Sequence, residues 1–153
     1  MKRMLHIVAG VVIILTTVTF AMTSSVQNKI EIVALTPEQV RWFTPSSYKD
    51  GRQRARLLGD SSQGGTWVER VKIPGGLRAL AHKHVQDEQI TVIEGIWHMG
   101  EGERFDSTKL KAYPAGSFII IPAGVPHFVA ANSGAVIVQV SGTGKPRTDY
   151  LEK

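Results

Sequence analysis

The sequence contains no cysteine. Without thiols the chain cannot form a disulfide scaffold, an iron–sulfur cluster, a cysteine nucleophile or a thiolate metal site. Any bound metal ion must therefore take nitrogen and oxygen ligands. Phosphate-binding loops of the G-x-x-x-x-G-K-[ST] and G-x-G-x-x-G types are absent as well, which removes the common sequence signatures of nucleotide binding.

Amphipathic helical periodicity is also missing from the chain. Instead, the chain has 15 glycines and 7 prolines, and from residue 66 onward short β-rich runs alternate with Gly/Pro turns. Together with a length of 153 residues, this pattern predicts one all-β domain, a sandwich, jelly roll or barrel. The predicted strands are 66–73, 77–84, 89–94, 96–99, 117–121, 127–130 and 135–140.

The N-terminal segment 1–25 has the layout of a secretory signal peptide. Lys2 and Arg3 form a positive start, and an apolar stretch over 7–22 follows that is shorter than the ~20 residues of a comfortable membrane span. We expect cleavage and export to the periplasm or the outside, with an uncleaved membrane anchor as the alternative. Removing two cations from the net charge of +5 leaves +3, and export argues against nucleic acid as a partner.

The remaining chain divides into an N-terminal arm with the first strands (26–65), a barrel (66–145) and a C-terminal tail (146–153). Within the arm, Ile30–Leu35 is predicted as a short apolar strand and Thr36–Gln39 as one helical turn, with a proline at its first position. Alternation places Arg52, Arg54 and Arg56 on one strand face. A solvated strand face is the ordinary interpretation, and a phosphate-binding stripe is the alternative.

Histidines carry most of the chemistry that the sequence offers. His82 and His84 are one residue apart, so a strand presents both imidazoles on one face. Glu88 follows at an even offset and can return a carboxylate to the same side. His127 comes after the turn IPAGVP, whose prolines restrict the backbone that leads to it. Imidazole and carboxylate together suit iron, manganese, nickel, zinc and copper.

These residues resemble the two motifs of the cupin family. Five positions match the first motif, and four match the second: Gly76, His82, His84, Glu88 and Gly95, then Gly116, Pro122, Gly124 and His127. The asparagine that should end the second motif is missing, because Ala131 stands in its place and Asn132 follows one residue later.

The resemblance implies a small double-stranded β-helix, or jelly-roll, barrel with one divalent metal ion held by His82, His84, Glu88 and His127. Fe²⁺ is favoured among the possible metals, and Glu88 could also act as a catalytic base. A mononuclear dioxygenase or related oxidoreductase acting on a small organic substrate is the first functional hypothesis. A non-catalytic metal- or ligand-binding module and a metal-dependent isomerase or lyase are the alternatives.

Two further residues are weaker pocket candidates. His98 could lie near the site or be a half-exposed strand histidine, and Tyr113 could contact a substrate or simply pack. Four apolar residues are expected to narrow the barrel interior, namely Phe118, Ile120, Phe128 and Val138. Because edge strands tend to pair, a homodimer is expected, with the segment 30–42 crossing to the second copy.

Overall fold

The computed structural model describes residues 32–152, so the predicted leader lies outside the described residues. All strands among the described residues belong to one compact unit that begins at Val33. Between residues 32 and 152, no helix is long and apolar enough to cross a membrane.

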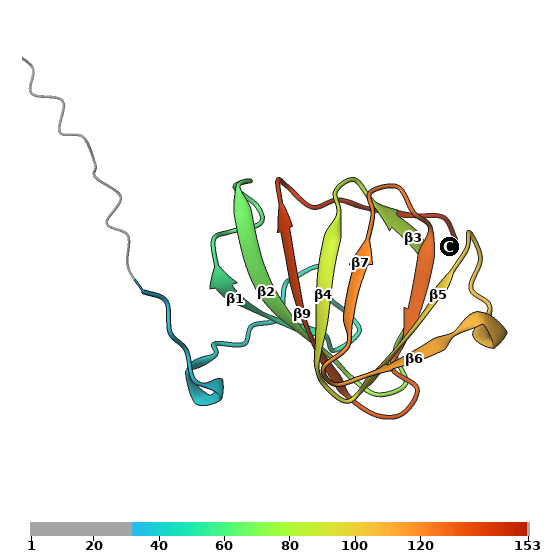
Figure 1. Cartoon of the computed structure of the whole chain (residues 1–153), viewed down its shortest axis with the longest axis horizontal. Coiled ribbons are helices and arrows are strands. Elements are labelled where there is room, and N and C mark those ends of the chain that lie inside the picture. Colours follow the sequence, from blue (N-terminus) through green and yellow to red (C-terminus); the bar gives the residue numbers. More distant parts are fainter. Residues whose placement is uncertain (1–31, 153) are drawn as a thin grey trace, which may run out of the picture. The chain divides into compact units, whose positions relative to one another are not determined.

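In the part of the chain that the structure describes, ten strands form two five-stranded antiparallel sheets, which confirms the all-β jelly-roll prediction (Figure 1). The first sheet has the order β1-β2-β9-β4-β7 and the second the order β10-β3-β8-β5-β6. The first consists of β1 (Gln53–Leu58), β2 (Thr66–Ile73), β9 (Val136–Thr143), β4 (Glu88–Glu94) and β7 (Phe118–Ile121). The second consists of β10 (Thr148–Tyr150), β3 (Arg78–His84), β8 (His127–Ala130), β5 (Ile96–Glu101) and β6 (Lys111–Pro114).

The core lies between the inner faces of the two sheets. Ile90 and Val138 come from one sheet and Trp97 and Val129 from the other, and all four are buried in one apolar cluster. Since side chains alternate along each strand, one face of every strand can enter this cluster. Toward one end of the same inner faces, polar side chains stand in place of apolar ones, and these polar residues form the candidate functional site.

Strand β7 corrects one expectation about the interior. Ile119 and Ile121 are the inward residues, while Phe118 and Ile120 are 60% and 57% exposed on the outer face. Phe128 is fully buried, but its ring packs against Gly100 and Phe105 rather than in the inner cluster. Only Val138 of the four lies where we predicted, because an unbroken apolar run does not tell which residues face inward.

The N-terminal arm differs from its prediction in part. The helical turn is confirmed as the 3-10 helix η1 (Pro37–Gln39), where the Thr36 N–H donates to Oε1 of Gln39 at 2.8 Å. The predicted strand over 30–35 is wrong for its described part: residues 32–35 form no strand, and Ile32 is 96% exposed. Apolar composition alone cannot make a strand where no neighbouring strand pairs with it.

Candidate metal centre

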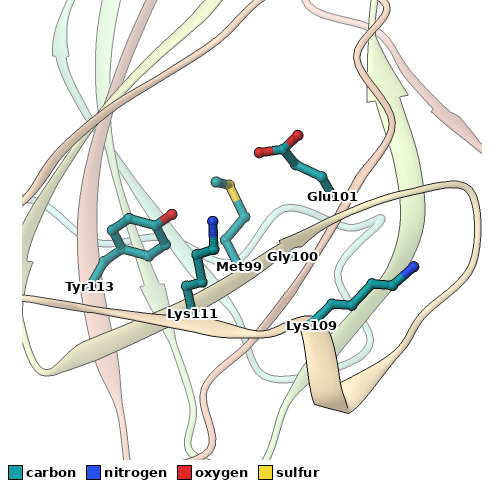
Figure 2. Close-up of a pocket in the computed structure, with 6 residues that line it drawn as sticks. All are labelled: Met99, Gly100, Glu101, Lys109, Lys111 and Tyr113. Carbon is teal, nitrogen blue, oxygen red and sulfur yellow. The ribbon is translucent and has the colours of Figure 1, made fainter.

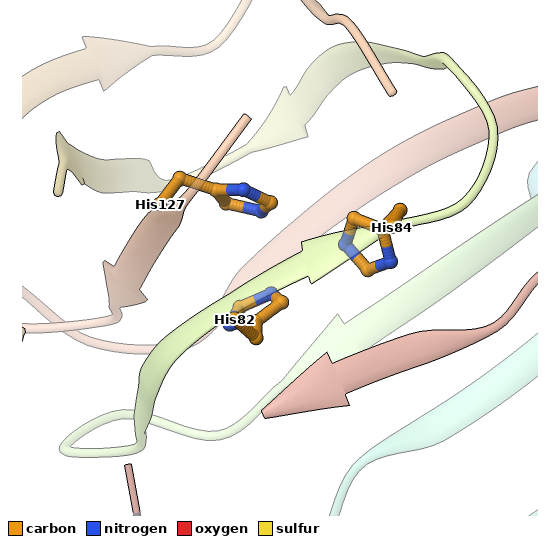
Figure 3. Close-up of side chains that lie close together, drawn as sticks. All are labelled: His82, His84 and His127. Carbon is orange, nitrogen blue, oxygen red and sulfur yellow. The ribbon is translucent and has the colours of Figure 1, made fainter. Parts of the chain in front are cut away.

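Three histidines converge inside the barrel (Figure 3). His82 and His84 come from β3, and His127 lies directly opposite His82 on the neighbouring strand β8. One ring nitrogen from each residue lies within 4.8 Å of the others, and all three side chains are buried. The sequence placed these imidazoles together, and one ion between them can take a ligand from each.

The turn before His127 explains why two distant motifs meet. Gly124 has a φ of +79°, a backbone conformation that glycine adopts without strain. In this conformation its N–H donates to the carbonyl oxygen of His84 at 2.8 Å. This hydrogen bond fixes the turn of the second motif to the histidine strand of the first.

Each imidazole has an outer partner on its Nδ1 atom. For His82 the partner is the carbonyl oxygen of Leu80 at 2.6 Å, and for His127 it is that of Val125 at 3.1 Å. The third Nδ1, of His84, lies 3.2 Å from the hydroxyl of Thr148. A carbonyl can only accept, so it requires the proton on Nδ1 and leaves Nε2 with a lone pair. Metal-binding histidines are oriented in this way.

Glu88 approaches the histidines from the opposite sheet. The turn over 85–87 carries the chain from β3 to the first residue of β4, and the Glu88 carboxylate Oε2 lies 3.3 Å from Nε2 of His84. Only 14% of the Glu88 side chain is exposed. The structure therefore places one carboxylate oxygen beside His84, one of the three histidines.

Burial sets the protonation of the four side chains. It lowers the pKa of His84 to about 3, with the neighbouring histidines acting in the same direction, and lowers the pKa of His127 to about 4. The pKa of His82 is lowered by burial and by the nearby Arg52 guanidinium. Burial raises the pKa of Glu88 to about 7, against the influence of Arg54. Neutral imidazoles have the lone pairs that metal binding requires, so the donor set fits a divalent cation.

These pKa values also determine the charges of His84 and Glu88 at their contact. With His84 neutral above pH 3 and Glu88 protonated below pH 7, the two are not oppositely charged at any pH in between. The 3.3 Å contact is therefore not a salt bridge in the metal-free protein.

A cavity of about 350 Å³ runs past the four side chains. Its wall includes Arg54 and Glu69, whose Nη1 and Oε2 atoms are 2.8 Å apart. Arg54 thus departs from the expected solvated strand face, because it lines the cavity and only 33% of its side chain is exposed, whereas Arg56 is exposed. Alternation shows which residues share a face but not whether that face meets a cavity.

The two weaker candidates lie elsewhere. Tyr113 lines a separate hollow of about 280 Å³ at the edge formed by β5 and β6, together with Met99, Glu101 and Lys111 (Figure 2). The three histidines do not line this hollow. His98 alternates with the core residues Trp97 and Met99 on β5 and is half-buried outside both cavities.

Ala131, which replaces the motif asparagine, leaves the turn after His127 intact. Its N–H donates to the carbonyl oxygen of Leu77 at 2.9 Å, and its own carbonyl accepts from the Gly76 N–H at 2.8 Å. The methyl group is fully buried. Backbone hydrogen bonds to the start of the first motif thus hold this turn without a side-chain amide.

The fold, the two motifs and the converging histidines together define a cupin. Residues 31–144 match the family described as the ChrR cupin-like domain, and the chain belongs to this family. No curated protein matches the chain in sequence.

Solved structures share the fold at low sequence identity. The polyketide cyclase RemF from Streptomyces resistomycificus has a TM-score of 0.65 at 15% identity, covering 80% of this chain and 87% of its own. A sugar phosphate isomerase of the cupin superfamily from Silicibacter pomeroyi has a TM-score of 0.57 at 23% identity, covering 76% and 80%. The anti-sigma protein ChrR, solved with SigE of Rhodobacter sphaeroides, has a TM-score of 0.52 at 24% identity, covering 70% and 51%.

Proposed function

We propose that this protein is a mononuclear metal-dependent cupin whose ion is held by His82, His84 and His127, with Glu88 as the fourth ligand. The observation that carries the proposal is the convergence of three buried ring nitrogens within 4.8 Å. Fe²⁺ is the first candidate, and Mn²⁺, Ni²⁺, Zn²⁺ and Cu²⁺ accept the same donors. The proposed location is outside the cytoplasm, following the leader-like sequence of residues 1–25.

The proposed activity is that of a dioxygenase or related oxidoreductase on a small organic substrate. A bound divalent ion would supply Lewis acidity and a position for the substrate. The chain itself would supply the walls that exclude water and a carboxyl group at Glu88 for proton transfer. Without the ion, burial raises the pKa of Glu88 to about 7, and a bound divalent cation would lower it, so Glu88 would serve as a carboxylate that accepts a proton.

Metal content tests the proposed centre directly. Elemental analysis of the purified wild-type protein should find one divalent ion per chain, and His82→Ala and His127→Ala should each lose it. The matched control is His98→Ala, which removes an imidazole on the same sheet outside the cavity and should retain the ion. Full metal content in both ligand variants would contradict the proposal.

A non-catalytic metal-binding module is the second candidate. It is favoured by the family match and by the likeness to ChrR, a protein solved in complex with a sigma factor. Oxygen consumption by the iron-loaded protein, measured with β-diketones, flavonols and small thiols, distinguishes the two. Turnover of any of them supports the enzyme, and a persistent blank with tight metal retention supports the module.

A further inference from the structure

We propose that the cavity at the metal centre binds a small organic monoanion, a carboxylate with an apolar body, and that Arg52 at the cavity rim holds its anionic end. This inference rests on the proposed metal centre and goes beyond it by naming the class of ligand. It is carried by the contacts of two arginines, the charge around them and the walls of the cavity.

The rim is built from two segments far apart in sequence. Tyr48, Arg52 and Arg54 come from the N-terminal side, while Thr148 and Tyr150 come from β10. The guanidinium carbons of Arg52 and Arg54 lie 4.2 and 5.3 Å from the centre of the Tyr48 ring. On the other side, the ring of Tyr150 lies 5.4 Å from that of His82. The rim therefore reaches from the arginines to a candidate metal ligand.

Arg54 is fixed in place by a partly buried network. Its Nε donates to the hydroxyl of Tyr48 at 2.6 Å, and its Nη1 donates to Glu69, whose other oxygen accepts from Ser61 at 2.8 Å. The side chain of Glu69 is only 3% exposed. An arginine that is 33% exposed but bound to a buried carboxylate through this many hydrogen bonds has little freedom, so Arg54 serves to position the rim.

Arg52 has fewer partners. Its acidic partner is Asp50, two residues earlier, and 22% of the Arg52 side chain and 38% of the Asp50 side chain are exposed. Ion pairs that water reaches on both sides are weaker than pairs with a buried carboxylate, so turning from Asp50 to a ligand costs Arg52 less than leaving Glu69 would cost Arg54. Among residues 32–152, the hydrogen bonds of Arg52 go to Asp50 through Nε, with Nη2 in the ion pair, and leave Nη1 free for an anion.

The charges around the cavity favour a single negative charge on the ligand. Arg52 and Arg54 are balanced by Asp50 and Glu69. A divalent ion beside an ionised Glu88 then leaves one uncompensated positive charge. In a cavity of low dielectric, a monoanion neutralises this excess positive charge. A dianion would instead leave one uncompensated negative charge.

The rest of the wall selects for a small apolar body. The cavity of about 350 Å³ is at the lower end of the ~300–1,000 Å³ of typical small-molecule sites. Beyond the histidines its lining is mainly aliphatic and aromatic, with Val71, Ile73, Ile90, Val129, Val138 and Val140 among the residues. Sugars and other polyols would leave their hydroxyl groups unpaired against such a wall.

The test is calorimetric binding of matched probes to the zinc-loaded full chain, with metal content measured on each sample. Zinc supports no redox turnover, so the readout is binding alone. The probes are benzoate and hexanoate, with the neutral benzamide for comparison. Arg52→Gln should weaken binding of both carboxylates about 10-fold and leave benzamide unchanged. The control Arg56→Gln, an exposed arginine near the end of β1, should bind all probes as the wild type does.

The outcomes separate this inference from the proposed function. A zinc-filled wild type that binds neither carboxylate, or an Arg52→Gln variant that binds both as tightly as the wild type does, would overturn the inference and leave the metal centre standing. A wild type that takes up no zinc would overturn both. Partial recovery of carboxylate binding in Arg52→Lys, which keeps the charge, supports the inference and shows that the site is folded.

Discussion

The hydroxyl of Thr148 lies 3.2 Å from Nδ1 of His84, so the last strand of the fold touches a candidate metal ligand. Strand β10 pairs with β3 in register, with Thr148 opposite His84 and Tyr150 opposite His82. The C-terminal segment therefore contributes both to the second sheet and to the surroundings of the metal centre.

The first prediction concerns this contact. Thr148→Val keeps the shape of the side chain but removes the hydroxyl beside His84, so the imidazole loses an orienting partner. We expect metal affinity to fall about 10-fold, measured by competition with a chelator. Thr143→Val removes an exposed hydroxyl whose partner is Thr66 and should leave the affinity unchanged. Equal affinities in the two variants would contradict the role of Thr148.

The second prediction concerns the turn that joins the two motifs. Gly124→Ala forces a methyl group onto a residue with a φ of +79°, which should cost about 1–2 kcal/mol in the free energy of unfolding, measured in urea. Gly144→Ala places the same strain at a φ of +89° away from the histidines. Only Gly124→Ala should also weaken metal binding, because only Gly124 donates to His84. Loss of metal affinity in both variants would point to general unfolding instead.

The third prediction concerns Glu152, whose Oε2 atom accepts from two backbone N–H groups, Phe105 at 2.7 Å and Ala81 at 3.2 Å. Glu152→Ala leaves both donors without this acceptor and should lower the free energy of unfolding by about 1–2 kcal/mol. Glu152→Gln keeps an acceptor oxygen and should lose less, and the exposed Glu103→Ala should lose nothing. A Glu152→Ala protein as stable as the wild type would show that water replaces the carboxylate at no cost.

The fourth prediction is a pH dependence of the metal-free protein. Burial holds the pKa values of His82, His84 and His127 below the ordinary 6.5, so the unfolded chain binds protons more readily than the folded one. Their contribution to stability is thus present above pH 6.5 and is lost as the pH falls from there toward 4. Glu88 acts in the opposite sense: with its pKa raised to about 7, it favours the folded state as the pH falls from 7 to 4.5.

The combined contribution of the three histidines to the pH dependence of the free energy of unfolding is larger than that of Glu88. Urea unfolding of chelator-treated protein should therefore show lower stability at pH 5 than at pH 7. Glu88→Gln removes the opposing contribution and should make this loss steeper. A wild type with equal stability at the two pH values, or a shallower loss in Glu88→Gln, would contradict the assignment.

Much of the fold could be predicted from local sequence signals. Strands β2 (Thr66–Ile73) and β8 (His127–Ala130) have the predicted bounds, because glycine, proline and polar turns delimit them. Strands β6 and β10 were missed, since KAYP and TDY are too short and too mixed to show alternation. They are strands because β5 and β3 offer them free edges, which is a property of the assembled sheet.

The site residues could be predicted only where their spacing in the sequence determines on which face of a strand the side chains lie. The spacing of His82 and His84 places both on one face of β3, and the second motif identified His127. Arg54 was expected on a solvated face and Glu69 was not predicted, because their ion pair joins β1 to β2 diagonally, with Arg54 opposite Val71 and Glu69 opposite Arg56. The outer partners of the three imidazoles were not predictable either, since two of them are backbone carbonyls, which every residue has.

The direct pairing of His82 with His127 on adjacent strands has a consequence for stoichiometry. All proposed donors of the centre come from a single chain, so the metal dissociation constant should not depend on the oligomeric state. Each copy in an assembly would fill and empty independently, and a titration should saturate at one equivalent per chain without sigmoidal character.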